Sequence, residues 1–168
     1  MRLLSAMLML PVLAAGCGES LTLAQKQQRI RAMAREYHSS FPEVPYITPA
    51  QLEKRLQAGS AVLIDVRPQA ERRVSMIPDA ATIAQLQKQR DAWRDKTLVF
   101  YCTIGFRSGK QAEDYRQQGF ETMNLKGGIL AWLHAGKAVR DADGPVKKVH
   151  VYGEPWNLAP AAYETVTY

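Results

Sequence analysis

The sequence of 168 residues is poor in cysteine, with two, and it has no dense block of basic residues and no internal repeat. Its net charge of +6 is spread along the chain, which argues against nucleic acid as a partner and slightly favours small anions or anionic lipid. The histidines are scattered and thiols are few, so we expect no zinc site, no other metal site and no cofactor. Hydrophobic residues make up 46% of the chain, which is enough for one packed domain with extensions.

Long apolar runs are also missing, apart from LLSAMLMLPVLAA near the start, and this run is too short to cross a bilayer within a folded protein. It follows Arg2 and leads into the small residues of AAGC, a pattern typical of a cleaved signal peptide. The cysteine after Ala15-Gly16 resembles the lipobox of bacterial lipoproteins, although Leu13 stands one position further from Cys17 than is usual. An ordinary secretory peptide and an uncleaved anchor are the alternatives.

The lipobox resemblance implies a signal peptide over residues 1–16, lipidation of Cys17, and a folded domain anchored at the membrane of the bacterial cell envelope, outside the cytoplasm. Lipidation would leave Cys102 as the lone thiol, so no internal disulfide could form. Exported proteins usually use their cysteines in pairs, and a lone exported thiol is open to oxidation. We therefore expect a chemical role for Cys102.

Residues 17–45 are expected to hold the anchor, a basic helix and a linker. From Leu21 to His38 the apolar residues have helical spacing, and the basic residues fall mostly on other faces. This helix is either a spacer, packed on the domain or solvated, or it lies on the membrane surface. The proline-rich stretch SSFPEVPYITP then predicts a turn-rich linker.

Apolar runs typical of buried strands alternate with helical patterns after the linker. We predict strands over residues 61–65, 97–101 and 121–125, and helices over residues 49–59, 84–93, 107–118 and 127–139. Thr48, Pro49 and Gln51 match the N-cap, first and third positions of the first of these helices. The alternation indicates an α/β fold with a parallel sheet.

A C-terminal extension over residues 140–168 follows, and it carries four aromatic residues: Tyr152, Trp156, Tyr163 and Tyr168. They either pack on the domain as a strap or form a docking surface for a partner. Trp132, in the last predicted helix, is expected to be a core residue.

Cys102 is predicted to follow a strand directly and to open a short loop into the next helix. Open α/β sheets bind ligands at the carboxyl ends of their strands, which is where this sulfur would lie. Backbone N–H groups of the loop, the helix N-terminus and Arg107 would favour the thiolate and attract an anionic substrate. Gly105 permits an unusual backbone conformation, and Ser108 could satisfy free amides at the helix start. The candidate substrate-binding residues are Thr103, Ile104, Gly105, Phe106, Arg107 and Ser108.

The stretch CTIGFRSG resembles the active-site loop of rhodanese-like domains, the sulfurtransferase family. Two further segments agree: VLIDVRPQAERRVSMIPDA is similar to the family's Asp-Val-Arg motif and Ile-Pro turn, and LKGGILAWLHAGKAV to its closing Gly-Gly-x-x-Ala-Trp helix. The resemblance covers about residues 46–139 and implies a single rhodanese-like domain, with a parallel five-stranded sheet flanked by helices and a persulfide on the cysteine. It places Asp65 and Arg67 in the first motif, where we expect them to support the structure.

Three departures from the family pattern lie near the mouth of the site in the family fold. Ser75-Met76 precede Ile77-Pro78 where many members have Gly-His, Asp79 stands for the usual glycine, and residues 70–73 match the usual Glu-x-x-Tyr/Phe poorly. These changes bear on the substrate more than on the chemistry.

Four residues, 103–106, separate Cys102 from Arg107, whereas cysteine phosphatases need a longer loop to enclose a phosphate. This spacing favours sulfur transfer: Cys102 would take sulfur from an anionic donor such as thiosulfate and pass it to cyanide, a thiol or a partner protein. The apolar rim formed by Ile104 and Phe106 argues against thiosulfate as the sole donor. The alternative is a module with little turnover, in which Cys102 senses oxidants or hands sulfur to one partner.

Overall fold

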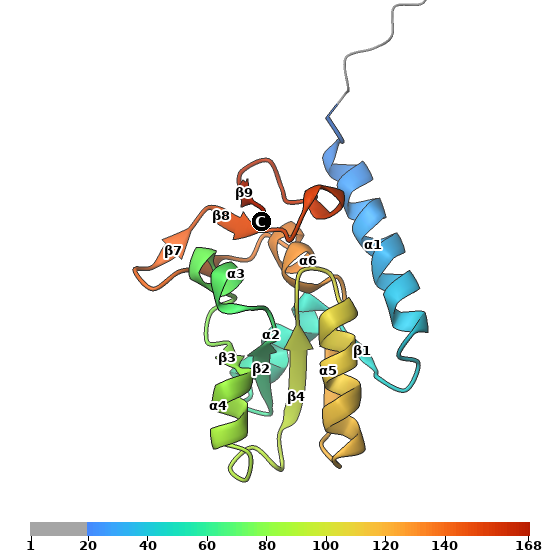
Figure 1. Ribbon diagram of the computed structural model, residues 1–168, viewed down its shortest axis with the longest axis vertical. Coiled ribbons are helices and arrows are strands. Elements are labelled where there is room, and N and C mark those ends of the chain that lie inside the picture. The colour runs from blue at the N-terminus through green and yellow to red at the C-terminus, as the bar shows by residue number, and fades with distance from the viewer. Residues whose placement is uncertain (1–19) are drawn as a thin grey trace, which may run out of the picture.

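Five parallel strands form the central sheet of the computed structural model, which describes residues 20–168 (Figure 1). In sheet order they are β1 (Tyr46–Ile47), β5 (Thr122–Leu125), β4 (Thr97–Tyr101), β2 (Ala61–Asp65) and β3 (Ala81–Thr82). The predicted α/β fold with a parallel five-stranded sheet is therefore confirmed. The predicted signal peptide over residues 1–16 and the lipidated Cys17 lie outside the described residues.

The helices are α1 (Leu23–Ser39), α2 (Pro49–Gln57), α3 (Gln69–Val74), α4 (Ile83–Lys88), α5 (Phe106–Gln117) and α6 (Gly128–His134). Local capping signals fix several of their starts. At α2 the Thr48 hydroxyl accepts a hydrogen bond from the backbone N–H of Gln51 at 3.3 Å, and Pro49 takes the first position, as predicted. Within residues 20–168, none of these helices has the length and apolarity needed to span a bilayer.

Two helices end earlier than the sequence pattern predicted. Helix α6 stops at His134 because Gly136 adopts a left-handed φ of +74°, a common way to end a helix. Helix α4 stops at Lys88, and the chain then turns over residues 89–95. In this turn the guanidinium of Arg94 lies 4.5 Å from the centre of the Phe120 ring.

Strands β1 and β3 were missed in the sequence, because a strand of two residues is too short to show an alternating pattern.

Strand β4 lies between two hydrophobic cores, one on each face of the sheet. Its residues Leu98 and Phe100 belong to the core that includes residues of α4 and α5. Val99 and Tyr101 belong to the opposite core, which includes residues of α1, α2 and α6. All five residues of β4 are buried, so its carboxyl end is held firmly in place.

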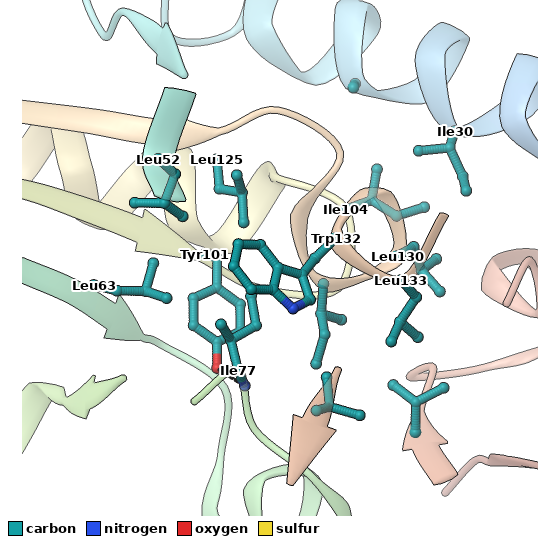
Figure 2. Packing of buried hydrophobic residues seen from close by; sticks show 14 of the residues in the cluster. Ile30, Leu52, Leu63, Ile77, Tyr101, Ile104, Leu125, Leu130, Trp132 and Leu133 are labelled. Atoms are coloured by element: carbon teal, nitrogen blue, oxygen red, sulfur yellow. Dashed lines mark hydrogen bonds between the residues drawn. The ribbon is translucent and has the colours of Figure 1, made fainter. Parts of the chain in front are cut away.

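Helix α1 packs on the domain as part of this second core. Its residues Ile30 and Ala34 are buried, and Figure 2 shows Ile30 reaching from α1 toward Leu130 and Ile104. Trp132 lies in the same core, beside Tyr101, as predicted (Figure 2). The structure thus supports a helix packed on the domain, while contact with a membrane surface stays a prediction.

The C-terminal extension also joins this core, through Val149, Val151, Leu158 and Ala159. It forms the antiparallel pair β6 (Val139–Arg140) and β7 (Pro145–Val146), the parallel pair β8 (Lys148–His150) and β9 (Glu164–Val166), and the 3₁₀ helix η1 (Glu154–Trp156). Figure 1 shows it crossing the end of the domain where β4 runs into α5. It packs as a strap, which places Tyr152 and Trp156 close to the Cys102 loop.

Candidate active site

Cys102 follows the last residue of β4, so the buried sheet sets the position of its sulfur. The residue is 3% exposed. Its Sγ accepts a hydrogen bond from the Gly105 N–H at 3.2 Å and one from the Ser108 hydroxyl at 3.4 Å. Gly105 has a φ of +142°, which side chains resist. Within residues 20–168, Sγ thus accepts from one loop N–H group and one hydroxyl, where we predicted several loop N–H groups.

Ser108 does not cap the helix, contrary to the prediction, because its hydroxyl turns toward the sulfur and toward β5. Its Oγ lies 2.8 Å from Oδ1 of Asn124, and Nδ2 of Asn124 donates to the carbonyl of Gly105 at 2.8 Å. Asn124 therefore ties Gly105 of the cysteine loop and the first turn of α5 to the neighbouring strand. Asn124 could not be predicted as a site residue, because these contacts join positions that are far apart in the chain.

Arg107 faces a partner that the prediction overlooked, Glu71 of α3. Its Nη1 and Nη2 lie 2.5 Å and 3.0 Å from the two carboxylate oxygens of Glu71, and Nη2 also donates to the Thr103 hydroxyl at 3.0 Å. Burial by itself would lower the pKa of Arg107, but the hydrogen bonds of Glu71, together with the negative charges of Cys102 and Glu71, raise it above its usual range. The guanidinium is therefore a paired cation, where a free anion-steering charge was expected.

Glu71 is fully buried, and its carboxylate also accepts a hydrogen bond from the Tyr168 hydroxyl at 3.0 Å. Burial by itself would raise the pKa of this carboxyl, but the hydrogen bonds and charge of Arg107, with Arg67 and Tyr168 adding to them, hold it below its usual range. A lowered folded-state pKa means that the ionised carboxylate stabilises the native state above the unfolded pKa. That stabilisation is lost as the pH falls through the folded value.

We expect Glu71→Gln to lower the free energy of unfolding at neutral pH by roughly 2 kcal/mol, because the charged hydrogen bonds to Arg107 are lost. Below about pH 4.5, the usual carboxyl value, the wild type should lose this stabilisation as well, so the two curves should converge. Urea denaturation measured across this range checks the prediction. Tyr168→Phe is the control, because it removes one neutral hydrogen bond from Glu71 and keeps the acid dependence. Parallel curves for Glu71→Gln and the wild type would count against this account.

Asp65 and Arg67 form a fully buried ion pair at the end of β2, as the first family motif led us to expect. Nη2 of Arg67 lies 2.7 Å from the Asp65 carboxylate and also donates to the carbonyl of Ser75 at 2.7 Å. The Tyr101 hydroxyl donates to Asp65 at 2.6 Å and accepts from the Ile77 N–H at 3.1 Å. Burial raises the pKa of Tyr101 well above its usual value, so this hydroxyl stays a donor. The ion pair thus connects the ends of β2 and β4 with the segment at Ser75 and Ile77, and it stabilises the part of the sheet from which the cysteine loop begins.

The chain matches the family described as Rhodanese-like domain over residues 48–135, just over half of its length. This chain belongs to the rhodanese-like family. The match spans α2 to α6, which includes the cysteine loop, the buried ion pair of Asp65 and Arg67, and Glu71.

Two relatives of the rhodanese-like region carry sulfurtransferase names. YtwF of Bacillus subtilis, whose sulfurtransferase name is provisional, is 36% identical over 94 residues, which cover 54% of this chain and 91% of YtwF. A protein named sulfurtransferase from Allochromatium vinosum is 32% identical over 103 residues, covering 58% of this chain and 96% of the relative. The crystal structure of a rhodanese-related protein from Thermoplasma volcanium has a TM-score of 0.50 and 26% identity, over 57% of this chain and 97% of that chain. These likenesses support sulfur transfer at the level of the family.

The rhodanese-like loop is locked to α6 by a close backbone approach at Gly128. The N–H groups of Ile129 and Leu130 donate to the carbonyls of Cys102 and Thr103 at 3.0 Å and 3.3 Å. A Cβ atom on Gly128 would lie 2.4 Å from the Cys102 carbonyl oxygen, and the residue has a φ of +56°. Only glycine fits here without moving the cysteine loop.

We expect Gly128→Ala to lower the free energy of unfolding by roughly 2 to 3 kcal/mol and to reduce activity at the same time, because the loop must shift to admit the methyl group. Gly136→Ala is a matched control: its φ is +74°, but no atom lies within 4 Å of the added Cβ. It should cost about 1 kcal/mol and leave activity unchanged. Thermal denaturation and a sulfur-transfer assay on both variants separate the steric clash from the backbone strain, and equal effects in the two would refute the clash.

A cavity of about 330 Å³ opens over the rhodanese-like loop. Cys102 and the loop residues Thr103, Ile104, Gly105, Phe106 and Arg107 line it, whereas Ser108 lies behind the sulfur. The remaining wall comes from outside the family match, from Tyr37 of α1 and from Tyr152 and Trp156 of the strap. Tyr37 was missed as a site residue because nothing in its helix pattern connects it to the loop.

No group of three or more His, Cys, Asp or Glu side chains in residues 20–168 is arranged to hold a metal ion.

Proposed function

We propose that this protein is a sulfurtransferase in which Cys102 carries sulfur as a persulfide between a donor and a nucleophilic acceptor. One observation supports this most directly. The free thiol lies in the family's loop, at the carboxyl end of a parallel strand, and it lines a cavity large enough for a small ligand. The short loop between Cys102 and Arg107 favours sulfur over phosphate chemistry, and the sulfurtransferase relatives agree.

In the first step the Cys102 thiolate attacks the outer sulfur of a donor such as thiosulfate. A sulfur–sulfur bond forms to Sγ, the donor's own sulfur–sulfur bond breaks, and sulfite leaves with the electron pair. The Gly105 N–H and the Ser108 hydroxyl, which now contact Sγ, lower the energy of the negative charge on the thiolate and on the persulfide. Glu71 holds Arg107 and Thr103 in place beside the reacting sulfur atoms.

In the second step an acceptor nucleophile, either cyanide or a thiolate of a small molecule or a protein, attacks the outer sulfur of the persulfide. The Sγ–sulfur bond breaks and its electron pair stays on Sγ, which regenerates the Cys102 thiolate. The cysteine is neither oxidised nor reduced over the whole cycle, so no second cysteine is required.

Mass spectrometry of the intact protein tests this proposal. Treatment with thiosulfate should add the mass of one sulfur atom, cyanide should remove it, and a sulfur-transfer assay over a panel of donors should show turnover. The competing function is a thiol sensor, in which Cys102 becomes oxidised to a sulfenic acid or a mixed disulfide. Oxygen adducts or mixed disulfides, without any gain of sulfur from a donor, would favour the sensor.

We also propose that the protein is anchored to a membrane of the bacterial cell envelope through a lipid on Cys17, with the domain outside the cytoplasm. The support is the sequence pattern before Cys17 and the exposed basic residues Arg29, Arg31 and Arg35 on α1. The lipid predicts that the protein sediments with membranes and incorporates labelled fatty acid. Cys17→Ala should abolish the label, and a labelled Cys17→Ala protein would exclude this anchor.

A further inference from the structure

Side chains from three parts of the chain form a closed ring around the mouth of the cavity. The Phe106 ring lies 5.5 Å from the Tyr37 ring, and the Tyr37 hydroxyl accepts a hydrogen bond from Nε1 of Trp156 at 3.3 Å. The Trp156 ring lies 5.1 Å from the Tyr152 ring, which in turn lies 4.9 Å from Cζ of Arg107. Arg107 follows Phe106 in the chain and closes the ring. Four aromatic side chains thus surround the approach to the thiol.

Two of these aromatic side chains are exposed to an unusual degree. Phe106 is 50% exposed and Tyr152 is 44% exposed, although large hydrophobic side chains are mostly buried in residues 20–168. Exposed apolar surface that gathers at one cavity, beside a reactive group, is typical of a binding site for an apolar ligand.

Tyr152 is also held in a strained backbone conformation. Its φ is +71°, which is rare for a bulky residue and costs about 1 kcal/mol or more. The N–H of Tyr152 donates to Nδ1 of His150 at 3.1 Å, and this bond helps to hold the conformation. Burial keeps the pKa of His150 below its usual range, so Nδ1 remains free to accept at neutral pH. The chain thus tolerates strain in order to direct this ring to the cavity.

Charge in the cavity does not suit a small dianion. Among the lining residues of the described chain, Arg107 is the only cation, and both of its terminal nitrogens contact the carboxylate of Glu71. One face of its guanidinium is covered by the Tyr152 ring. An anion with two charges would lose its hydration here without gaining a free cation in return.

We infer that the sulfur donor of this protein is an organic sulfur compound with at most one negative charge, whose apolar or aromatic group lies within the aromatic ring of side chains. This inference rests on the proposed sulfur transfer and specifies its substrate. The transferred sulfur would reach Sγ while the organic group stays among Tyr37, Tyr152 and Trp156. The leaving group is then an organic anion such as a sulfinate, which takes the electron pair of the broken sulfur–sulfur bond.

Three sulfur donors test the inference on the full chain: benzenethiosulfonate, methanethiosulfonate and thiosulfate. The first two carry the same single charge and differ only in the organic group. The ratio of their kcat/KM values therefore measures how much the protein's aromatic side chains favour a phenyl group over a methyl group. We expect benzenethiosulfonate to exceed methanethiosulfonate by about tenfold or more, and thiosulfate to be the poorest donor.

Two variants locate the source of this preference. Tyr152→Gly removes one aromatic side chain from the mouth of the cavity. Because glycine adopts a positive φ easily, this variant should fold at least as well as the wild type. Trp156→Ala removes a second ring. Each should lower the ratio about three- to tenfold. Tyr163→Ala is the matched control, since it deletes a strap aromatic that does not line the cavity, and it should keep the wild-type ratio.

The outcomes separate this inference from the proposed function. If none of the three donors adds sulfur to Cys102, the proposed function itself fails. If sulfur is added but thiosulfate is the best donor, or the ratio in Tyr152→Gly and Trp156→Ala equals that of the wild type, sulfur transfer stands and the aromatic site for the donor is overturned. An equal fall in Tyr163→Ala would also overturn it, because the effect would then come from loosening of the strap.

Discussion

Replacing Cys102 by serine is expected to abolish sulfur transfer, with a fall in kcat/KM of roughly 10³-fold or more. A serine hydroxyl occupies a similar volume and can still accept from the Gly105 N–H, but it cannot form a persulfide. Sulfur transfer to cyanide, followed as thiocyanate, measures the loss. Intact mass after donor treatment should show no added sulfur in the variant.

The second cysteine of the chain provides the matched control for this experiment. Cys17→Ser should keep both the sulfur uptake and the turnover, because Cys102 alone lies in the family loop. Sulfur uptake that persists in Cys102→Ser and disappears in Cys17→Ser would show that Cys17, and not Cys102, carries the sulfur. The unfolding transition of Cys102→Ser should match the wild type, since the substitution leaves the packing of β4 unchanged.

The cysteine loop could be located from the sequence because its determinants are local. The buried strand before Cys102, the glycine at position 105 and the helix that follows are each set by neighbouring residues. Asp79 is a second example of a feature that depends on the local backbone. It stands where the family usually has glycine, and yet it adopts a φ of 60°, so the turn is kept although the residue has changed.

The partners of the loop could not be predicted, since they come from distant parts of the chain. Glu71 lies in a helix far from Arg107 in sequence, and Asn124 lies on a neighbouring strand. Residues 70–73 match the family pattern poorly, which obscured the role of Glu71. Tyr37 reaches the cavity only because α1 packs across α5 and α6. Such contacts depend on tertiary packing, and local propensity contains no information about it.

Asp65→Ala is expected to cause the largest loss of stability among the substitutions considered, a fall of roughly 3–5 kcal/mol in the free energy of unfolding. The substitution leaves the guanidinium of Arg67 buried without its counter-ion, and it removes the acceptor of the Tyr101 hydroxyl. Both side chains of the ion pair are 0% exposed, so water cannot replace the lost carboxylate. Urea denaturation at neutral pH measures the change.

An exposed ion pair supplies the comparison for this buried one. Lys148→Ala breaks a contact of 2.9 Å with Glu164 on the strap, where the side chains are 45% and 67% exposed, and it should cost about 1 kcal/mol or less. The double variant Asp65→Leu with Arg67→Met then distinguishes two causes. If the damage in Asp65→Ala comes from an unpaired buried charge, the double variant should recover much of the lost stability, because neither charge remains. If it stays as unstable as Asp65→Ala, the bonds of Arg67 to Asp65 and to Ser75 would be what stabilises this end of the sheet.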